Sequence, residues 1–172
     1  MNIQSVVQGN IYMQNQSILA SGGLGADTNG EVVIKSRFGD VSADIGKAIS
    51  FSRGLLGMPD RFRFILANFP SAKMQQFKLL QSLDEVQLSF ITLPLDMQNA
   101  IIGVDDLRMA CKDLQISEQQ AAILLIVSVH RTPDQVKLSV NSRAPLIIDA
   151  ERRSGVQYVF QNDAYKVQHM LD

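Results

Sequence analysis

The feature that most constrains the fold is a series of short segments with a strand-like pattern, separated by turn residues. Between Arg61 and Leu66 the side chains Phe62, Phe64 and Leu66 alternate with Arg61, Arg63 and Ile65, a period of two that is typical of a strand with one covered face. Further strands are predicted on either side of Gly39-Asp40 within 31–46, and then at 47–51, 76–83, 86–93 (ended by Pro94), 121–130, 136–140, 144–149 and 156–161.

One segment changes to a helical period. Val104, Leu107, Cys111 and Leu114 recur at the spacing of one helix face, and Asp105 and Asp106 lie near its start, where the helix dipole favours acids. The segment predicts a short helix over 104–114. Many short strands with one or two short helices indicate a mainly β chain, with an antiparallel sheet that curls into a β-barrel-like domain.

Residues 1–30 differ in composition from the rest of the chain. They are rich in Gln, Asn, Ser and Gly, and such a segment cannot bury enough apolar surface to offset the entropy lost on ordering. We therefore expect a flexible polar tail over 1–30, followed by one β-barrel domain over 31–172.

Several glycine, asparagine and proline residues are predicted to shape turns. Gly39-Asp40 suits a two-residue hairpin turn, because glycine accepts a positive φ. Gly54 and Gly57 could clamp a phosphate, but Met58-Pro59 stands where a phosphate loop needs Lys-Ser/Thr; the favoured interpretation is a corner between strands. Asn141 and Pro145 frame a break between two strands.

Composition bounds the classes of function. The 172 residues carry a net charge of −1, which argues against a basic nucleic-acid-binding face. No segment reaches the roughly 18 apolar residues that cross a bilayer, and the first residues do not read as a signal peptide. A single cysteine, Cys111, fits a reducing cytoplasm.

No catalytic set or cofactor site is predicted. His130 and His169 have no partners at the spacing of metal ligands, and Cys111 lies on an apolar helix face. These observations favour a binding protein, not an enzyme, with no metal and no cofactor. The candidate partner-binding residues are an acidic rim of Asp84, Glu85, Asp96, Asp105 and Asp106 for a basic partner, and an alternative rim of Arg53, Arg61 and Arg63 for an acidic partner. Most acids in such positions are turn and cap residues that face water.

Five motifs, in conserved order over about residues 31–171, resemble the flagellar assembly factor FliW family. The family's F-x-x-G-L-P-G-F turn is similar to Phe51–Met58, with Leu56 and Met58 as departures, and its R-F-G hairpin is similar to Arg37–Val41. Its L-Q-S-x-D segment matches Leu80–Asp84, which Leu88-Ser89-Phe90 follows. Near the end, Asn141–Leu146 resembles N-L-x-A-P, with Ser142 in place of Leu, and Gly155–Gln157 resembles G-x-Q.

The resemblance implies a non-enzymatic regulator in the cytoplasm. Such proteins bind flagellin and also CsrA, a repressor of flagellin translation, so that accumulated flagellin releases CsrA. We expect a monomer that binds neither nucleic acid directly nor a membrane. Two other classes stay open at this point: a flavin-binding oxidoreductase on a split barrel, and a nucleic-acid-binding β-barrel.

Deletion of residues 1–30 tests the predicted tail. Because the segment cannot support a core, its removal should shift the melting temperature by no more than about 4 °C, the effect of losing about 1 kcal/mol at this size. Thermal unfolding checks this, and a drop of more than about 10 °C would show that the segment docks on the barrel.

Overall fold

The computed structural model describes residues 31–69, 71 and 74–171, so the predicted tail lies outside the described residues. The elements in chain order are β1 (Glu31–Ser36), β2 (Gly39–Asp44), the 3₁₀ turn η2 (Ile45–Lys47), β3 (Ile49–Ser50), β4 (Arg63–Asn68), β5 (Lys78–Ser82), β6 (Ser89–Leu95), α1 (Val104–Asp113), β7 (Ala121–Arg131), β8 (Val136–Val140), β9 (Leu146–Asp149), β10 (Ser154–Gln157) and β11 (His169–Leu171).

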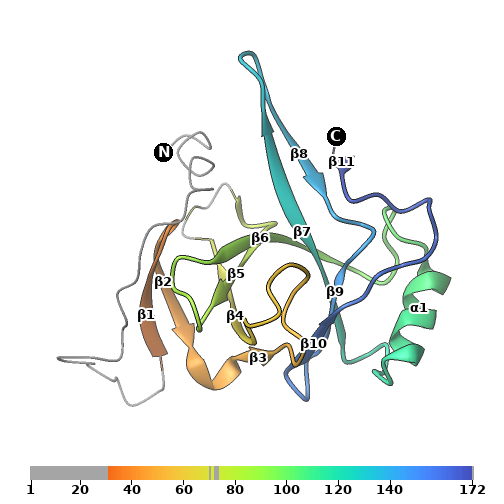
Figure 1. Ribbon diagram of the computed structural model, residues 1–172, viewed down its shortest axis with the longest axis horizontal. Helices are drawn as coiled ribbons and strands as arrows, with labels where there is room; N and C mark the ends of the chain where they lie inside the picture. The colour runs from red at the N-terminus through yellow and green to blue at the C-terminus, as the bar shows by residue number, and fades with distance from the viewer. Residues whose placement is uncertain (1–30, 70, 72–73, 172) are drawn as a thin grey trace.

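Seven strands close into a barrel (Figure 1). They follow the order β7-β6-β5-β4-β3-β10-β9, and β9 pairs again with β7 to complete the ring. Every pair is antiparallel except β3–β10, which is parallel and consists of Ser50 opposite Ser154. The predicted mainly β, barrel-like fold with one helix near 104–114 is therefore confirmed.

The strand β7 serves both the barrel and a projecting arm. Its first part pairs with β6 on one edge and with β9 on the other, and from Val127 onward it pairs with β8. The last described strand, β11, adds to the far edge of β8. Figure 1 shows the β7–β8 hairpin, which we call the arm, projecting from the barrel.

Two layers of apolar side chains explain the continuous apolar run in β7. Leu124 points into the barrel with Phe51, Phe64 and Leu80. Ile123 and Leu125 point the other way, into a cluster with three buried residues of α1, Leu107, Ala110 and Cys111. Both faces of this part of the strand are covered, as the sequence predicted, because the helix packs against the outside of the barrel wall.

The first hairpin turns two residues earlier than predicted. Ser36 pairs with Gly39, so Arg37 and Phe38 form the turn and Gly39 begins β2. The ring of Phe38 meets that of Phe69 edge to face, with centroids 5.4 Å apart. This register gives Phe38 an apolar partner, whereas a turn at Gly39-Asp40 would shift the side-chain pairing along both strands.

Two strand details also differ from the prediction. Leu66 of β4 is exposed, and Ile65 is buried instead, because the β1–β2 hairpin covers that face with Ile34 and Ala43. Pro94 does not end β6, since it lies opposite Leu124 of β7. Pairing with β5 stops at Thr92, so Pro94 has a single strand neighbour, a position at which a missing N–H is tolerated.

The last predicted strand is shorter than expected. Regular pairing ends at Gln157, and β11 is a strand that the sequence did not indicate. Beyond β10 the chain stays close to residues 143–145, because Tyr158 N–H donates to the Pro145 carbonyl and Phe160 N–H to the Arg143 carbonyl. These bonds hold the segment against the barrel without forming a regular ladder.

The glycine pair makes a small closed loop after β3. Leu55 and Met58 bond to each other through both backbone N–H groups, at 3.1 and 2.8 Å, with Leu56 and Gly57 between them. Gly54 has φ +62° and Gly57 has φ +81°. Leu55 enters the barrel core at 3% exposure, whereas Leu56 is 59% exposed at the tip.

The two glycines should differ in what a side chain costs. A Cβ at Gly54 would lie 2.8 Å from the Pro59 Cα, in a backbone that cannot yield cheaply, whereas a Cβ at Gly57 would meet nothing within 4 Å. Gly57→Ala should therefore cost only the left-handed backbone penalty of about 1–2 kcal/mol, and Gly54→Ala clearly more. Urea unfolding of both variants checks the order, which equal losses would contradict.

Candidate functional site

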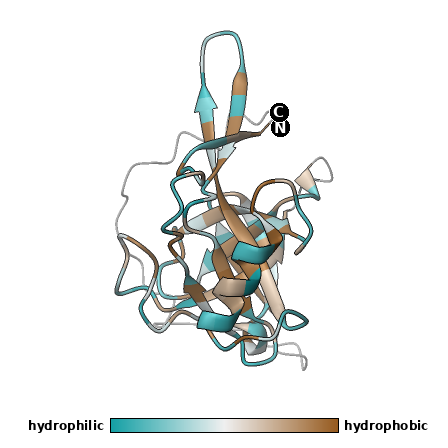
Figure 2. Ribbon diagram, turned by 90° about the vertical axis from the view of Figure 1, so that its right-hand side faces the viewer, coloured by the Kyte–Doolittle hydropathy of each residue, from teal (hydrophilic) through white to brown (hydrophobic). Residues whose placement is uncertain are grey.

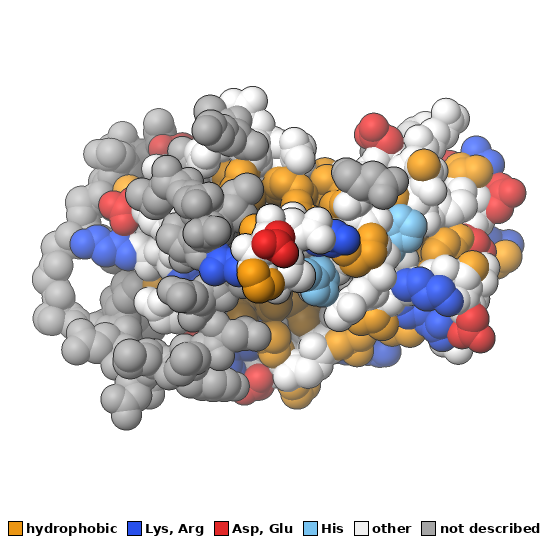
Figure 3. Space-filling model, turned by 90° about the horizontal axis from the view of Figure 1, so that it is seen from above, with side chains coloured by type: hydrophobic (Ala, Val, Ile, Leu, Met, Phe, Trp, Pro, Cys, Tyr) orange, Lys and Arg blue, Asp and Glu red, His pale blue; other side chains and the backbone are white. Residues whose placement is uncertain are grey.

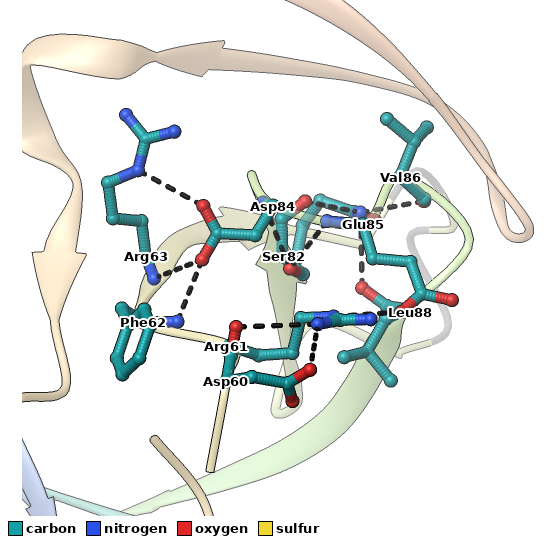
Figure 4. Close-up of polar contacts among 10 residues, drawn as sticks. Asp60, Arg61, Phe62, Arg63, Ser82, Asp84, Glu85, Val86 and Leu88 are labelled. Atoms are coloured by element: carbon teal, nitrogen blue, oxygen red, sulfur yellow. Dashed lines mark hydrogen bonds and ion pairs between the residues drawn. The ribbon is translucent and has the colours of Figure 1, made fainter. Parts of the chain in front are cut away.

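Asp84 and Glu85 form a polar cluster with two residues of the loop before β4 and with the first residue of β4 (Figure 4). The carboxylate of Asp84 accepts hydrogen bonds from the backbone N–H of Phe62 at 2.7 Å and of Arg63 at 2.9 Å, and from the Arg63 guanidinium at 3.1 Å. Arg61 pairs with Glu85 at 2.9 Å and with Asp60 at 2.7 Å. We call Asp60, Arg61, Arg63, Asp84 and Glu85 the Asp84 cluster.

A buried amide holds the loop that carries these two acids. Gln81 is completely buried, and its Nε2 donates to the carbonyls of Ser82, Val86 and Leu88 at 2.9, 2.8 and 3.1 Å. The Ser82 hydroxyl accepts from the N–H groups of Asp84 and Glu85. The Leu80-Gln81-Ser82 motif thus builds a fixed β5–β6 loop that places Asp84 against the β4 side.

The environment of Asp84 favours its charged form. Burial alone would raise the pKa of this carboxyl, but the N–H groups of Arg63 and Phe62 and the Arg63 guanidinium together lower the pKa below its ordinary value. The cluster sets three carboxylates against two guanidinium groups within hydrogen-bond reach. The charges of the cluster therefore interact mainly with one another, which is typical of residues with a structural role.

A second group of acids lies on α1 and is arranged differently. Asp106 accepts a hydrogen bond from the Tyr165 hydroxyl, and Asp113 accepts one from the Tyr158 hydroxyl at 2.7 Å. The Asp113 hydrogen bond is the main cause that raises the pKa of Tyr158, and burial followed by the Asp106 bond raises that of Tyr165. Both phenols stay neutral near pH 7, so they orient the two carboxylates without cancelling their charge.

Between these acids α1 presents an apolar side chain to solvent. Met109 is 61% exposed, and it lies four residues after Asp105 and four before Asp113, so the three share one stripe of the helix. Arg108 bridges Asp105 and Glu118, each at 3.3 Å, on the exposed surface, where such pairs are weak. We call Asp105, Asp106, Met109 and Asp113 the α1 face; Figure 2 shows α1 turned to the viewer with hydrophilic turns outward.

The structure therefore divides the predicted acidic rim and merges the two alternative rims. Asp84 and Glu85 are bound to Arg63 and Arg61, which had been predicted as a separate surface. Asp96 is exposed on the segment that leads from β6 toward α1, and Asp105 and Asp106 begin the helix. Arg53 is exposed in the loop after β3, and no described contact joins it to the Asp84 cluster.

The predicted break between β8 and β9 is held by its asparagine. Asn141 Oδ1 accepts from the Ala144 N–H at 2.9 Å, and Pro145 is buried directly before β9. Ser142, which departs from the family motif, is buried and exchanges hydrogen bonds with the backbone of Lys166. The hydroxyl thereby ties the C-terminal segment to this corner.

The remaining polar candidates have structural surroundings. His130 Nε2 lies 2.6 Å from the Ser139 hydroxyl across the arm, and His169 lies in β11. Burial raises the pKa of the Cys111 thiol, which disfavours the reactive thiolate. In residues 31–69, 71 and 74–171, no three His, Cys, Asp or Glu side chains are grouped to hold a metal ion.

A groove lies between the arm and the barrel. It has a volume of about 730 Å³ and is lined by Gln76, Phe77, Leu93, Lys137, Leu138 and Met170 among others.

No helix in the described part of the chain is long and apolar enough to span a membrane.

Comparison with known proteins gives one consistent match. Residues 32–171 match the family described as FliW protein. The chain belongs to the FliW family. The flagellar assembly factor FliW of Geotalea uraniireducens is 32% identical over 139 residues, which cover 80% of this chain and 82% of that protein. The namesake from Lachnoclostridium phytofermentans is 29% identical over 143 residues, covering 80% and 88%.

The fold has a counterpart among solved structures. A crystal structure of the flagellar assembly factor FliW superposes with a TM-score of 0.62 at 24% identity, covering 83% of this chain and 97% of the other. The FliW resemblance drawn from the five motifs is thus confirmed, and the FliW-type barrel is the scaffold that carries the α1 face and the Asp84 cluster.

Sequence reasoning missed the residues that separate the two groups of acids. Gln81 and Ser82 belong to the Leu80–Asp84 motif, but no local pattern shows that their side chains hold the β5–β6 loop. Tyr158 and Tyr165 lie 45 and 59 positions from the carboxylates they contact. The exposure of Met109 follows from its position on the side of the helix opposite the predicted apolar face, a signal that was available.

Replacing Asp84 should destabilise the fold. In Asp84→Ala two backbone N–H groups and a guanidinium lose their acceptor, which should lower the free energy of unfolding by about 1–2 kcal/mol. Because folding lowers the pKa of Asp84, this contribution is complete above the unfolded value near 4 and is lost as the pH falls through the folded value.

Urea unfolding of the parent and of Asp84→Ala at pH 7 and at about pH 3 measures this difference. Asp60→Ala is the matched control: its side chain is 72% exposed in a surface ion pair, so the loss should stay below about 1 kcal/mol. Equal stability of parent and Asp84→Ala at pH 7 would show that the cluster does not fasten the loop.

Proposed function

We propose that this chain is a non-enzymatic flagellar assembly factor that binds flagellin and a CsrA-type translational repressor in ways that exclude each other. Membership of the FliW family supports the flagellar role, since curated relatives carry the name flagellar assembly factor. The partners follow from the resemblance, and the level of flagellin would thereby set its own translation in the cytoplasm.

The observation that carries the proposal is the uncompensated charge of the α1 face. Counting from Asp105 to Glu118, four acids stand against Arg108 and Lys112, a net charge of −2. Two of these acids are held by neutral phenols and the other two share Arg108, whereas Asp84 and Glu85 each pair with a different arginine. A basic repressor therefore gains more from α1 than from the Asp84 cluster.

The composition of the α1 face also suits a protein interface. Stable interfaces place an apolar anchor inside a polar rim, and methionine adapts to irregular partner surfaces. Met109 is such an anchor, with Asp105 and Asp113 on either side of it along the helix. Tyr158 and Tyr165 hold the rim carboxylates in place before the partner arrives, which reduces the entropy lost on binding.

The surface charge supports a protein partner more than a nucleic acid. Over the described part of the face seen in Figure 3, acidic and basic side chains are interspersed. A nucleic-acid site would instead gather basic side chains on one face. We therefore place the regulatory effect in protein–protein binding.

Titration calorimetry with purified flagellin and CsrA, singly and together, tests the proposal. Each partner should bind alone, and saturation with one should abolish the heat of the other. Absence of heat with either partner well above about 1 μM would defeat the proposal, and simultaneous binding would defeat the exclusion.

Charge reversal on α1 tests the site. Asp105→Lys should weaken repressor binding by about tenfold and make it less salt-dependent, because it removes an attraction that salt screens. The Asp105 side chain is 93% exposed and takes little part in folding. Asp134→Lys makes the same change in the exposed β7–β8 turn and should leave affinity unchanged. Equal effects of the two variants would point to net charge, not to the α1 face.

A further inference from the structure

Among the described residues, the strand β1 has one edge without a strand neighbour. In the described part of the chain β1 pairs with β2 alone, in a two-stranded sheet that stands outside the barrel ring. Figure 1 shows β1 at the opposite end of the molecule from α1. Proteins usually blunt such edges, because the unpaired backbone groups are a template for another strand.

The register of the hairpin fixes which backbone groups face outward. Ser36 and Gly39 adjoin the two-residue turn, and a pair in that position exchanges both of its hydrogen bonds. Hydrogen-bonded and non-hydrogen-bonded residues alternate along an antiparallel pair, so Ile34 and Val32 also bond to β2. Glu31, Val33 and Lys35 therefore direct their N–H and C=O groups away from the hairpin.

The same three residues carry the exposed side chains of β1. Val33 is 63% exposed, and Glu31 and Lys35 are exposed on either side of it. Four residues of strand separate Glu31 from Lys35 by about 13 Å, too far for them to pair with each other. Within the hairpin Glu31 lies opposite Asp44, which pairs with Lys47 at 3.6 Å, and Lys35 lies opposite Asp40, so Glu31 is the one without a cation directly opposite it on β2.

We propose that the β1 edges of two copies of this chain pair antiparallel about a two-fold axis that passes through Val33. In this register Glu31 lies opposite Lys35 of the second copy, Val33 opposite its own counterpart, and Lys35 opposite Glu31 of the second copy. The outward backbone groups of all three residues find partners, and both cross-strand charge pairs are attractive.

Other positions of the two-fold axis along β1 give partners to fewer of its outward residues. An axis through Val32 would pair Glu31 with Val33 and leave Lys35 beyond the described strand of the second copy, and an axis through Ile34 would pair Val33 with Lys35 and set Glu31 against the turn. Only the axis through Val33 gives all three outward residues a partner within β1. The interface is isologous, as a two-fold pair requires. On the inner side Val32 lies opposite Ile34 of the second copy, so the apolar row beneath the hairpin continues across the junction.

The pairing gives a weak dimer that leaves the proposed partner surface free. Six residues from each copy bury much less than the roughly 1,200 Å² below which interfaces are weak or transient. Association therefore depends on concentration, and the monomer expected from the sequence is the state of the dilute protein. The α1 face lies at the far end of the molecule, so binding there and pairing at β1 do not compete.

Sedimentation velocity of the full chain from about 10 μM to about 1 mM tests the proposal. The parent should shift toward a dimer over this range. Glu31→Lys sets lysine against Lys35 of the second copy, and Lys35→Glu sets glutamate against Glu31, so each single variant should associate about tenfold more weakly. An equimolar mixture of the two variants restores both attractive pairs and should form a heterodimer of parental strength, as should the double variant with itself.

Val33→Pro separates edge pairing from folding. Proline removes an N–H that faces outward and leaves the β1–β2 ladder intact, so this variant should unfold like the parent yet stay monomeric. A parent that remains monomeric throughout the range overturns the proposal. Association that persists in Val33→Pro, or that the charge variants leave unchanged, also overturns it by placing the contact elsewhere.

Discussion

Closure of the barrel depends on β7, because its first part pairs with β6 on one edge and β9 on the other. A strand in that position must be apolar on both faces, and Leu124 fills the barrel while Ile123 and Leu125 receive α1. The helix is thus fixed against the barrel wall by the same residues that close the ring, and its outer side is left to present Asp105, Met109 and Asp113.

The acids predicted as one rim have two kinds of hydrogen-bond partner. Gln81 and Ser82 hold the β5–β6 loop, and its two carboxylates, Asp84 and Glu85, form ion pairs with arginines. The charges of these two acids therefore stabilise the fold. The phenols of Tyr158 and Tyr165 orient Asp113 and Asp106 and leave their charge available to a partner.

The sequence predicted the features that depend on local pattern. Alternation and helical spacing located most strands and α1, since both are set within a few residues. Features set by long-range register were missed: the return of β9 to β7, the strand β11, and the pairing of Asp84 with Arg63 across 21 positions. The sequence placed the first hairpin turn at Gly39-Asp40 and not at Arg37-Phe38, because Phe69, whose ring packs against Phe38, lies 31 positions away and leaves no local signal.

In the proposed function, a basic repressor contacts the α1 face and not the Asp84 cluster. Hydrogen exchange followed by mass spectrometry, with and without a purified CsrA-type repressor, tests it most directly. Backbone amides of residues 104–113 should exchange more slowly in the complex, and those of residues 83–88 should be unchanged. Protection of residues 83–88 with no change in the helix would contradict it.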